Sequence, residues 1–207
     1  MGISKAFSVV KLFEEEVAEW TGAKYGVAVE SCTMAIFLCL KYLQPKRVSI
    51  PRHTYPGVAM AIKNAGCELL FWNEDKSWQG QYVLMGTNIV DSALSFHKGM
   101  YSKLMQPAYQ CLSFHYKKLL PIGRGGMILT NDKDAIDWFK MARFDGRKEI
   151  PLSEDNATIL GWNAYMTPDQ AARGLALFEM VKNKELPDLK VEEQGYPDLS
   201  TWEVFRG

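Results

Sequence analysis

Apolar residues recur at helical spacing near the start of the chain, where they would form one face of a helix whose other face carries glutamates. That apolar face comprises Val9, Val10, Phe13, Val17 and Trp20. A later segment that is apolar nearly all round is typical of a buried helix. Together these patterns predict helices over residues 7–20, 33–43, 56–65, 132–144 and 168–181.

Short apolar runs between these helices predict strands over residues 25–29, 47–50, 67–72, 87–90, 110–114 and 126–129. Alternating strands and helices favour an α/β fold, with a doubly wound, mostly parallel sheet and helices on both faces. We expect residues 1–181 to form this domain and residues 182–207, which mix Pro, Gly and charge, to form an arm or loop. Because such sheets bind ligands at the carboxyl ends of their strands, the residues that follow the strands are the candidate site residues.

The composition narrows the class of protein. Basic and acidic residues number 24 each among 207, and this zero balance argues against a large nucleic-acid surface. No apolar run reaches the ~18 residues of a membrane span, so we expect no membrane segment. The four cysteines have no CxxC spacing and the three histidines are scattered, which favours reduced thiols in a cytoplasmic protein and no metal site.

The first two strand ends precede residues that could hold a cofactor. Ser31, Cys32 and Thr33 open the helix after the first strand, where hydroxyls and free backbone N–H groups can bind an anion such as phosphate. An ordinary helix cap explains the same residues. Tyr55 follows the second strand and could either stack on a planar ring or pack within the fold.

The later strand ends carry charged residues. Asp91 follows a buried strand and could cap a helix or pair with a cofactor nitrogen. Ser113, Lys117 and Lys118 follow another strand and precede the Gly-Gly pair at residues 125–126. A desolvated lysine at such a place can act as an amine nucleophile, whereas a solvated lysine is an ordinary surface cation.

The order of these features is more specific than any one of them. A helix-opening threonine, an aromatic residue, an aspartate, Ser-x-x-x-x-Lys and Gly-Gly follow one another as in one cofactor-dependent family. The sequence resembles the DegT/DnrJ/EryC1/StrS family, the pyridoxal-phosphate (PLP) sugar aminotransferases of fold type I, from about residue 13 to residue 181. The resemblance is carried by FEEEVAEWTGAKYGVAVESCTMAI, RHTYPGVAMAIKNAGCELLF, IVDSA, SFHYKK with GRGGMILTND, and GWNAYMTPDQAARG.

The resemblance implies a role for each candidate residue. Lys118 would form the Schiff base with PLP, Asp91 would pair with the pyridine nitrogen, and Tyr55 would stack on the ring. Asn163 would reach the phosphate of the partner subunit in a homodimer. The phosphate would otherwise be held by Ser31, Cys32, Thr33 and Ser113.

The family's reaction also implies the substrates. An amino-acid donor, glutamate, would pass its amine through PLP to a nucleotide-linked keto-sugar. Once freed from the cofactor, Lys118 would move a proton between the substrate α-carbon and C4′ of the cofactor as a general acid and base.

The chain departs from the family pattern in several places. Leu94 stands where the family has Gln or His, Cys32 where Gly is usual, Leu119 where Asn is usual and Tyr165 where Arg is usual. The stretch between residues 71 and 91 is short and the C-terminal small domain is largely absent, so the resemblance implies a reduced PLP-binding domain. Two other interpretations stay open: a different PLP-dependent activity on a small amine, and a non-catalytic domain for binding or assembly.

Overall fold

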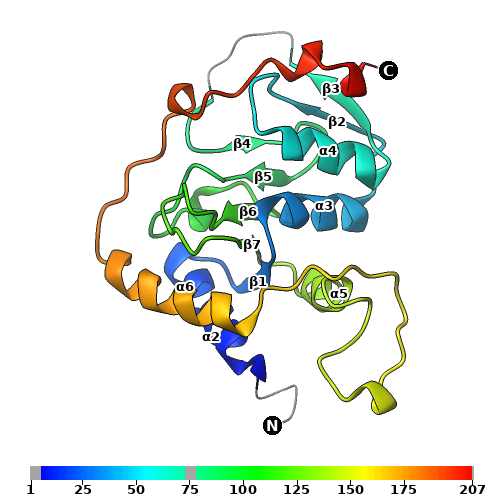
Figure 1. The fold of residues 1–207 in the computed structure, drawn as a ribbon, viewed down its shortest axis with the longest axis vertical. Coiled ribbons are helices and arrows are strands. Elements are labelled where there is room, and N and C mark those ends of the chain that lie inside the picture. Colours follow the sequence, from blue (N-terminus) through cyan, green and yellow to red (C-terminus); the bar gives the residue numbers. More distant parts are fainter. Residues whose placement is uncertain (1–5, 73–77, 207) are drawn as a thin grey trace.

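The computed structural model describes residues 6–72 and 78–206. A five-stranded sheet with the order β1-β7-β6-β5-β4 forms the centre of the fold (Figure 1). Its strands are β1 (Tyr25–Val29), β4 (Tyr82–Val83), β5 (Ile89–Asp91), β6 (Tyr109–Ser113) and β7 (Gly126–Thr130). A parallel pair, β2 (Arg47–Ile50) and β3 (Glu68–Phe71), lies beyond the β4 edge. Two backbone hydrogen bonds between Ser49 and Met85, of 3.0 and 2.9 Å, link this pair to the central sheet.

The prediction of an α/β fold is confirmed, whereas the pairing within the central sheet is mixed rather than mostly parallel. Strands β5 and β6 pair in parallel, while β7 is antiparallel to both of its neighbours and β4 is antiparallel to β5. Strand β7 follows β6 through a connection over residues 114–125 that contains no helix, whereas parallel neighbours are usually joined by a crossover helix. Strand β4 contains two residues, too few to give a pattern in the sequence.

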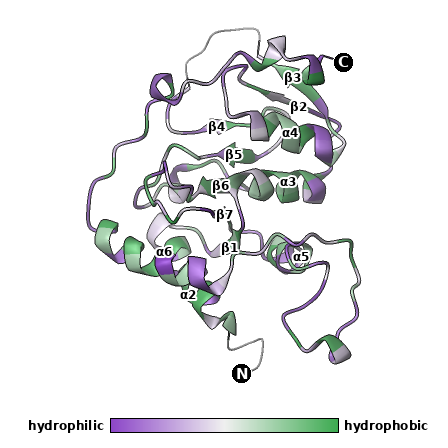
Figure 2. Cartoon of the chain, viewed as in Figure 1, coloured by the Kyte–Doolittle hydropathy of each residue, from purple (hydrophilic) through white to green (hydrophobic). Residues whose placement is uncertain are grey.

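Five helices cover the sheet within the described residues, close to the predicted positions. They are α2 (Ser8–Thr21), α3 (Cys32–Leu43), α4 (Pro56–Ala65), α5 (Lys133–Ala142) and α6 (Pro168–Val181). Side chains that alternate along the strands enter two apolar clusters, one shared with α2 and α6 and the other with α3, α4 and α5. Figure 2 shows α3 as mostly hydrophobic, as its predicted burial requires.

A buried ion pair ties three of these elements together. The guanidinium of Arg143, at the end of α5, pairs with the carboxylate of Glu14 on α2, and both side chains are almost fully buried. Arg143 also donates to the carbonyl of Ala28 in β1, while the N–H of Ala28 donates to Glu14. The pair fixes the first strand, whose carboxyl end opens on the candidate site.

The segment after α6 contains only short 3-10 turns, at Glu192–Gln194, Leu199–Thr201 and Glu203–Phe205. It passes along one side of the molecule from α6 toward β3, as the orange-to-red trace in Figure 1 shows. The division into a domain over residues 1–181 and an arm over residues 182–207 stays a prediction. In the described part of the chain, no helix combines the length and apolar character needed to cross a membrane.

Candidate active site

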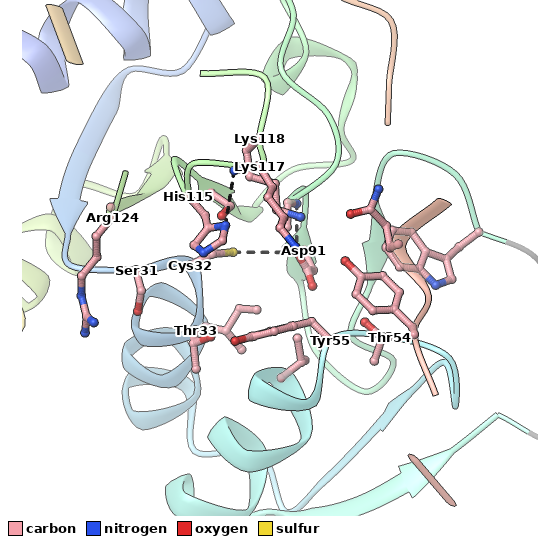
Figure 3. Close-up of a pocket in the computed structure, with 18 residues that line it drawn as sticks. Ser31, Cys32, Thr33, Thr54, Tyr55, Asp91, His115, Lys117, Lys118 and Arg124 are labelled. Atoms are coloured by element: carbon pink, nitrogen blue, oxygen red, sulfur yellow. Dashed lines mark hydrogen bonds between the residues drawn. The ribbon is translucent and has the colours of Figure 1, made fainter. Parts of the chain in front are cut away.

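One cavity of about 250 Å³ lies where the loops after β1, β2, β5 and β6 meet. Seven predicted site residues line it: Ser31, Cys32, Thr33, Tyr55, Asp91, Ser113 and Lys118. Figure 3 shows most of these residues gathered around the same space, although they come from loops far apart in the sequence. The residues that follow these strands therefore line one cavity, and their roles stay predictions.

Asp91 is a buried acidic residue that lines the cavity. It is the last residue of β5, only 2% exposed, and its Oδ1 accepts a 3.0 Å hydrogen bond from the Ala93 N–H. Burial raises the pKa of this carboxyl, and the Ala93 N–H, the Tyr82 hydroxyl and the Lys118 ammonium oppose the rise. Asp91 does not cap a helix, and it lines the cavity.

Lys118 is the cationic group in electrostatic contact with Asp91. It is half-buried, and burial lowers the pKa of its ammonium below the ordinary lysine range, while the charge of Asp91 partly restores it. Lys117 also lines the cavity but is exposed, with its ammonium 5.7 Å from the centre of the Tyr116 ring. Burial thus distinguishes Lys118 as the lysine whose amine is more easily kept neutral.

The start of α3 forms another wall. Ser31 is its N-cap and accepts a 3.1 Å hydrogen bond from the N–H of Met34, so the ordinary capping role is present. The remaining N–H groups of the first turn are those that a helix leaves free for an anion. A Cβ on Gly126 would collide with the backbone of Ser31 and Cys32, so this glycine lets β7 approach the helix start closely.

Tyr55 and Thr33 meet at the start of α4. Tyr55 is the N-cap of α4, is followed by Pro56, and exposes 56% of its surface beside the cavity. A Cβ on Gly57 would come within 2.7 Å of both the Tyr55 ring and the Thr33 hydroxyl oxygen, so the glycine keeps the two side chains together. An exposed aromatic ring at a cavity mouth is available to a planar ligand.

Cys32, the departure from the family's usual glycine, turns its thiol toward Asp91. Its Sγ lies 3.8 Å from Asp91 Oδ1 and 3.6 Å from the Cys111 carbonyl oxygen. Burial, followed by the charge of Asp91, raises the pKa of this thiol well above its ordinary value. The thiol stays protonated at neutral pH and supplies a weak donor to the buried carboxylate.

Asn163 does not line the cavity. It is exposed, and its side-chain amide donates a 3.2 Å hydrogen bond to Asp145 Oδ2. The neighbouring Ala164 accepts a 2.8 Å backbone hydrogen bond from Glu30, which places this loop beside the end of β1. The role of Asn163 toward a partner subunit stays a prediction.

Several cavity residues were not found from the sequence. Thr54 bonds the Tyr82 hydroxyl at 2.9 Å, and Tyr82 stands opposite Asp91 in the β4–β5 pairing. Trp78 and the tail residues Gln194 and Tyr196 also line the cavity. No sequence pattern marks Trp78, Gln194 and Tyr196, because they lie in segments without α-helix or strand, whereas Thr54 shares the loop after β2 with Tyr55.

Comparisons with known proteins show which family this sequence matches. The sequence matches the DegT/DnrJ/EryC1/StrS aminotransferase family over residues 3–82 and 103–186. GDP-perosamine synthase of Escherichia coli O157:H7 is 26% identical over 90% of this chain, and the chain spans 63% of that relative's length.

Solved structures show the same fold. AtS13 from Actinomadura melliaura has a TM-score of 0.71 at 18% identity, covering 88% of this chain and 64% of its own. PseC of Helicobacter pylori, an aminotransferase of pseudoaminic acid biosynthesis, has a TM-score of 0.71 at 13% identity, covering 99% of this chain and 83% of its own. By its matched sequence, and in agreement with its fold, the chain belongs to the DegT/DnrJ/EryC1/StrS aminotransferase family.

Proposed function

We propose that the protein is a PLP-dependent aminotransferase that passes an amine from an amino-acid donor, glutamate, to a nucleotide-linked keto-sugar. The observation that carries the proposal is the shared cavity of a half-buried Lys118 and a buried Asp91, beside the helix start that holds Ser31 and Thr33. The family match and the similarity to GDP-perosamine synthase support the substrate class.

The residues present fit PLP by their chemistry. A buried carboxylate suits the protonated pyridine nitrogen, a free helix start suits the phosphate, and the exposed ring of Tyr55 suits the ring face. Asp91 would pair with the nitrogen, and Ser31, Cys32, Thr33 and Ser113 would hold the phosphate. When bound, PLP supplies an electron sink that stabilises negative charge on the substrate carbon next to the amino group.

Lys118 would transfer the protons of the reaction. Because burial lowers the pKa of Lys118, its amine is neutral in a larger fraction of molecules than the amine of a surface lysine is. A neutral amine can bond covalently to the cofactor. When released, the same amine can take a proton from the substrate carbon that bears nitrogen and return it elsewhere. The negative charge of Asp91 limits how far the pKa falls, so Lys118 can also hold the proton between these events.

We also propose a cytoplasmic homodimer in which Asn163 serves the site of the partner subunit. The four cysteines are unpaired and buried, which supports a reducing compartment. Asn163 is exposed near the loop that joins the end of β1, which supports a role across an interface better than a role in its own cavity.

The test is the response of the PLP-loaded protein to L-glutamate. We expect L-glutamate to convert the visible absorbance of the bound cofactor to that of its amine form. After dialysis removes the L-glutamate, a keto-sugar acceptor should restore the original absorbance. Lys118→Ala should abolish the conversion, while Lys117→Ala, the adjacent exposed lysine, should retain it within about tenfold. Binding of PLP without any conversion by L-glutamate would contradict the proposed activity.

A further inference from the structure

The tail crosses back to the candidate site. Residues 188–199, which we term the C-terminal strap, are attached at both ends by the backbone: Leu189 N–H donates to the Leu94 carbonyl at 2.8 Å, and Leu199 N–H donates to the Arg52 carbonyl at 2.9 Å. In Figure 3 the tail passes on the side of the cavity away from α3. The two anchored residues, Leu189 and Leu199, thus stand on either side of the strap residues that line the cavity, Gln194 and Tyr196.

Side chains reinforce these anchors. Arg52 Nη1 lies 3.6 Å from Asp198 Oδ2, and the Tyr196 carbonyl oxygen lies 3.3 Å from His53 Nδ1. The Ser200 hydroxyl, aided by the charge of Arg52, lowers the pKa of Asp198, so this carboxylate stays ionised at neutral pH. Gln79 donates a 3.1 Å hydrogen bond to Glu192 on the other side of the strap. The strap is therefore held against the loops that precede α4 and β4.

Two strap side chains enter the cavity, Gln194 and Tyr196. The ring of Tyr196 is parallel to that of Trp78, with 13° between the planes and 6.3 Å between centroids. Trp78 is itself fixed by its indole N–H, which donates to the His53 carbonyl at 3.1 Å. Burial raises the pKa of the Tyr196 hydroxyl, and Asp91 and Cys32 add to the rise, so the hydroxyl is neutral; Tyr196 and Asp91 line the same cavity.

We propose that the C-terminal strap forms the wall that contacts the sugar acceptor, and that Tyr196 is its specificity-determining residue; this inference rests on the function proposed above. An aromatic ring with a hydroxyl, next to a side-chain amide, can pack on the C–H face of a sugar ring and bond its hydroxyls. A small amino acid needs to reach only the cofactor near Lys118. A nucleotide-linked sugar is longer and extends to the rim that the strap forms.

The experiment compares two amines on the PLP-loaded protein. L-Glutamate is the small donor, and GDP-perosamine, which is the product named by the curated relative, is the amino-sugar probe for the reverse direction. Rates of cofactor conversion are measured against concentration for wild type, Tyr196→Ala, Tyr196→Phe and the control Tyr25→Phe, a tyrosine of β1 outside the cavity. PLP absorbance before the amine is added reports whether each variant retains the cofactor site.

We expect Tyr196→Ala to raise the half-saturating concentration of GDP-perosamine about tenfold or more, and that of L-glutamate less than about threefold. Tyr196→Phe should show the part of this loss that belongs to the hydroxyl, and Tyr25→Phe should match wild type. Equal changes for both amines, or no change, would overturn the assignment of Tyr196 while leaving the proposed function intact. A wild-type protein whose cofactor is converted by L-glutamate but not by GDP-perosamine would overturn the proposal that the strap contacts the sugar. A wild-type protein whose cofactor is converted by neither amine would overturn the proposed function as well.

Discussion

At the scale of single residues, the site depends on two charged groups that adjust each other. Burial alone would make Asp91 harder to ionise and Lys118 harder to protonate, because each charged form loses solvation. Each charge opposes the shift that burial causes in the other group. The pair therefore keeps both an ionisable carboxyl and an ionisable amine in a partly buried cavity.

This mutual effect predicts the outcome of Asp91→Asn in the PLP-free protein. Without the carboxylate, the ammonium of Lys118 loses its favourable partner, so the pKa of Lys118 should fall further below its ordinary value near 10.4. Competitive acetylation of Lys118 across pH, followed by peptide mass analysis, measures that pKa. The exposed Lys117 provides an internal reference in the same digest. A Lys118 pKa that rises in Asp91→Asn would refute the proposed coupling.

At the scale of elements, the cavity depends on how closely β7 approaches the start of α3. Gly126 is the first residue of β7 and has no Cβ at the point where the backbone of Ser31 and Cys32 passes. The turn that carries Lys118 lies directly before Gly126 and connects β6 to β7. The start of α3, which is proposed to hold the phosphate, and the turn over residues 114–125 that carries Lys118 are thus held together by one close contact.

We therefore expect Gly126→Ala to displace the start of α3, weaken PLP binding at least about tenfold and lower the free energy of unfolding by about 1–3 kcal/mol. Gly66→Ala is the matched control, because Gly66 ends α4 at a φ of 88° with no atom within 4 Å of an added Cβ. The control should lose stability through backbone strain but bind PLP normally. Urea unfolding and PLP titration separate the two effects, and equal loss of PLP affinity in both variants would count against the close contact.

Sequence patterns predicted the elements that are long and regularly patterned. The helix from Ser8 to Thr21 and the strand from Tyr25 to Val29 carry complete apolar faces, and Gly22 in the left-handed conformation ends the helix. Asp91 and Lys118 could be found because they stand at strand ends in a specific order. Tyr82 and Tyr196 could not, since a two-residue strand and an irregular tail are positioned by tertiary contacts that leave no periodic signal.

At the scale of the whole molecule, the predicted role of Asn163 requires a second copy of the chain. Asn163 lies outside its own cavity, so an inactive Asn163→Ala chain and an inactive Lys118→Ala chain should complement each other when mixed. Random pairing makes half of the dimers mixed, and each mixed dimer has one intact site of two. Recovered amine transfer should therefore approach about a quarter of the wild-type value. Failure to recover activity from mixed, refolded subunits would show that Asn163 does not act across an interface.

The proposed function depends on Lys118 as the lysine that carries PLP. The most direct measurement is reduction of the PLP-loaded protein with borohydride, followed by proteolysis and mass mapping of the labelled peptide. We predict label on Lys118, its loss in Lys118→Ala and its retention in Lys117→Ala. Label on Lys117 or on any other lysine instead would contradict the assignment of the site, and no label on any lysine would contradict the proposed cofactor chemistry.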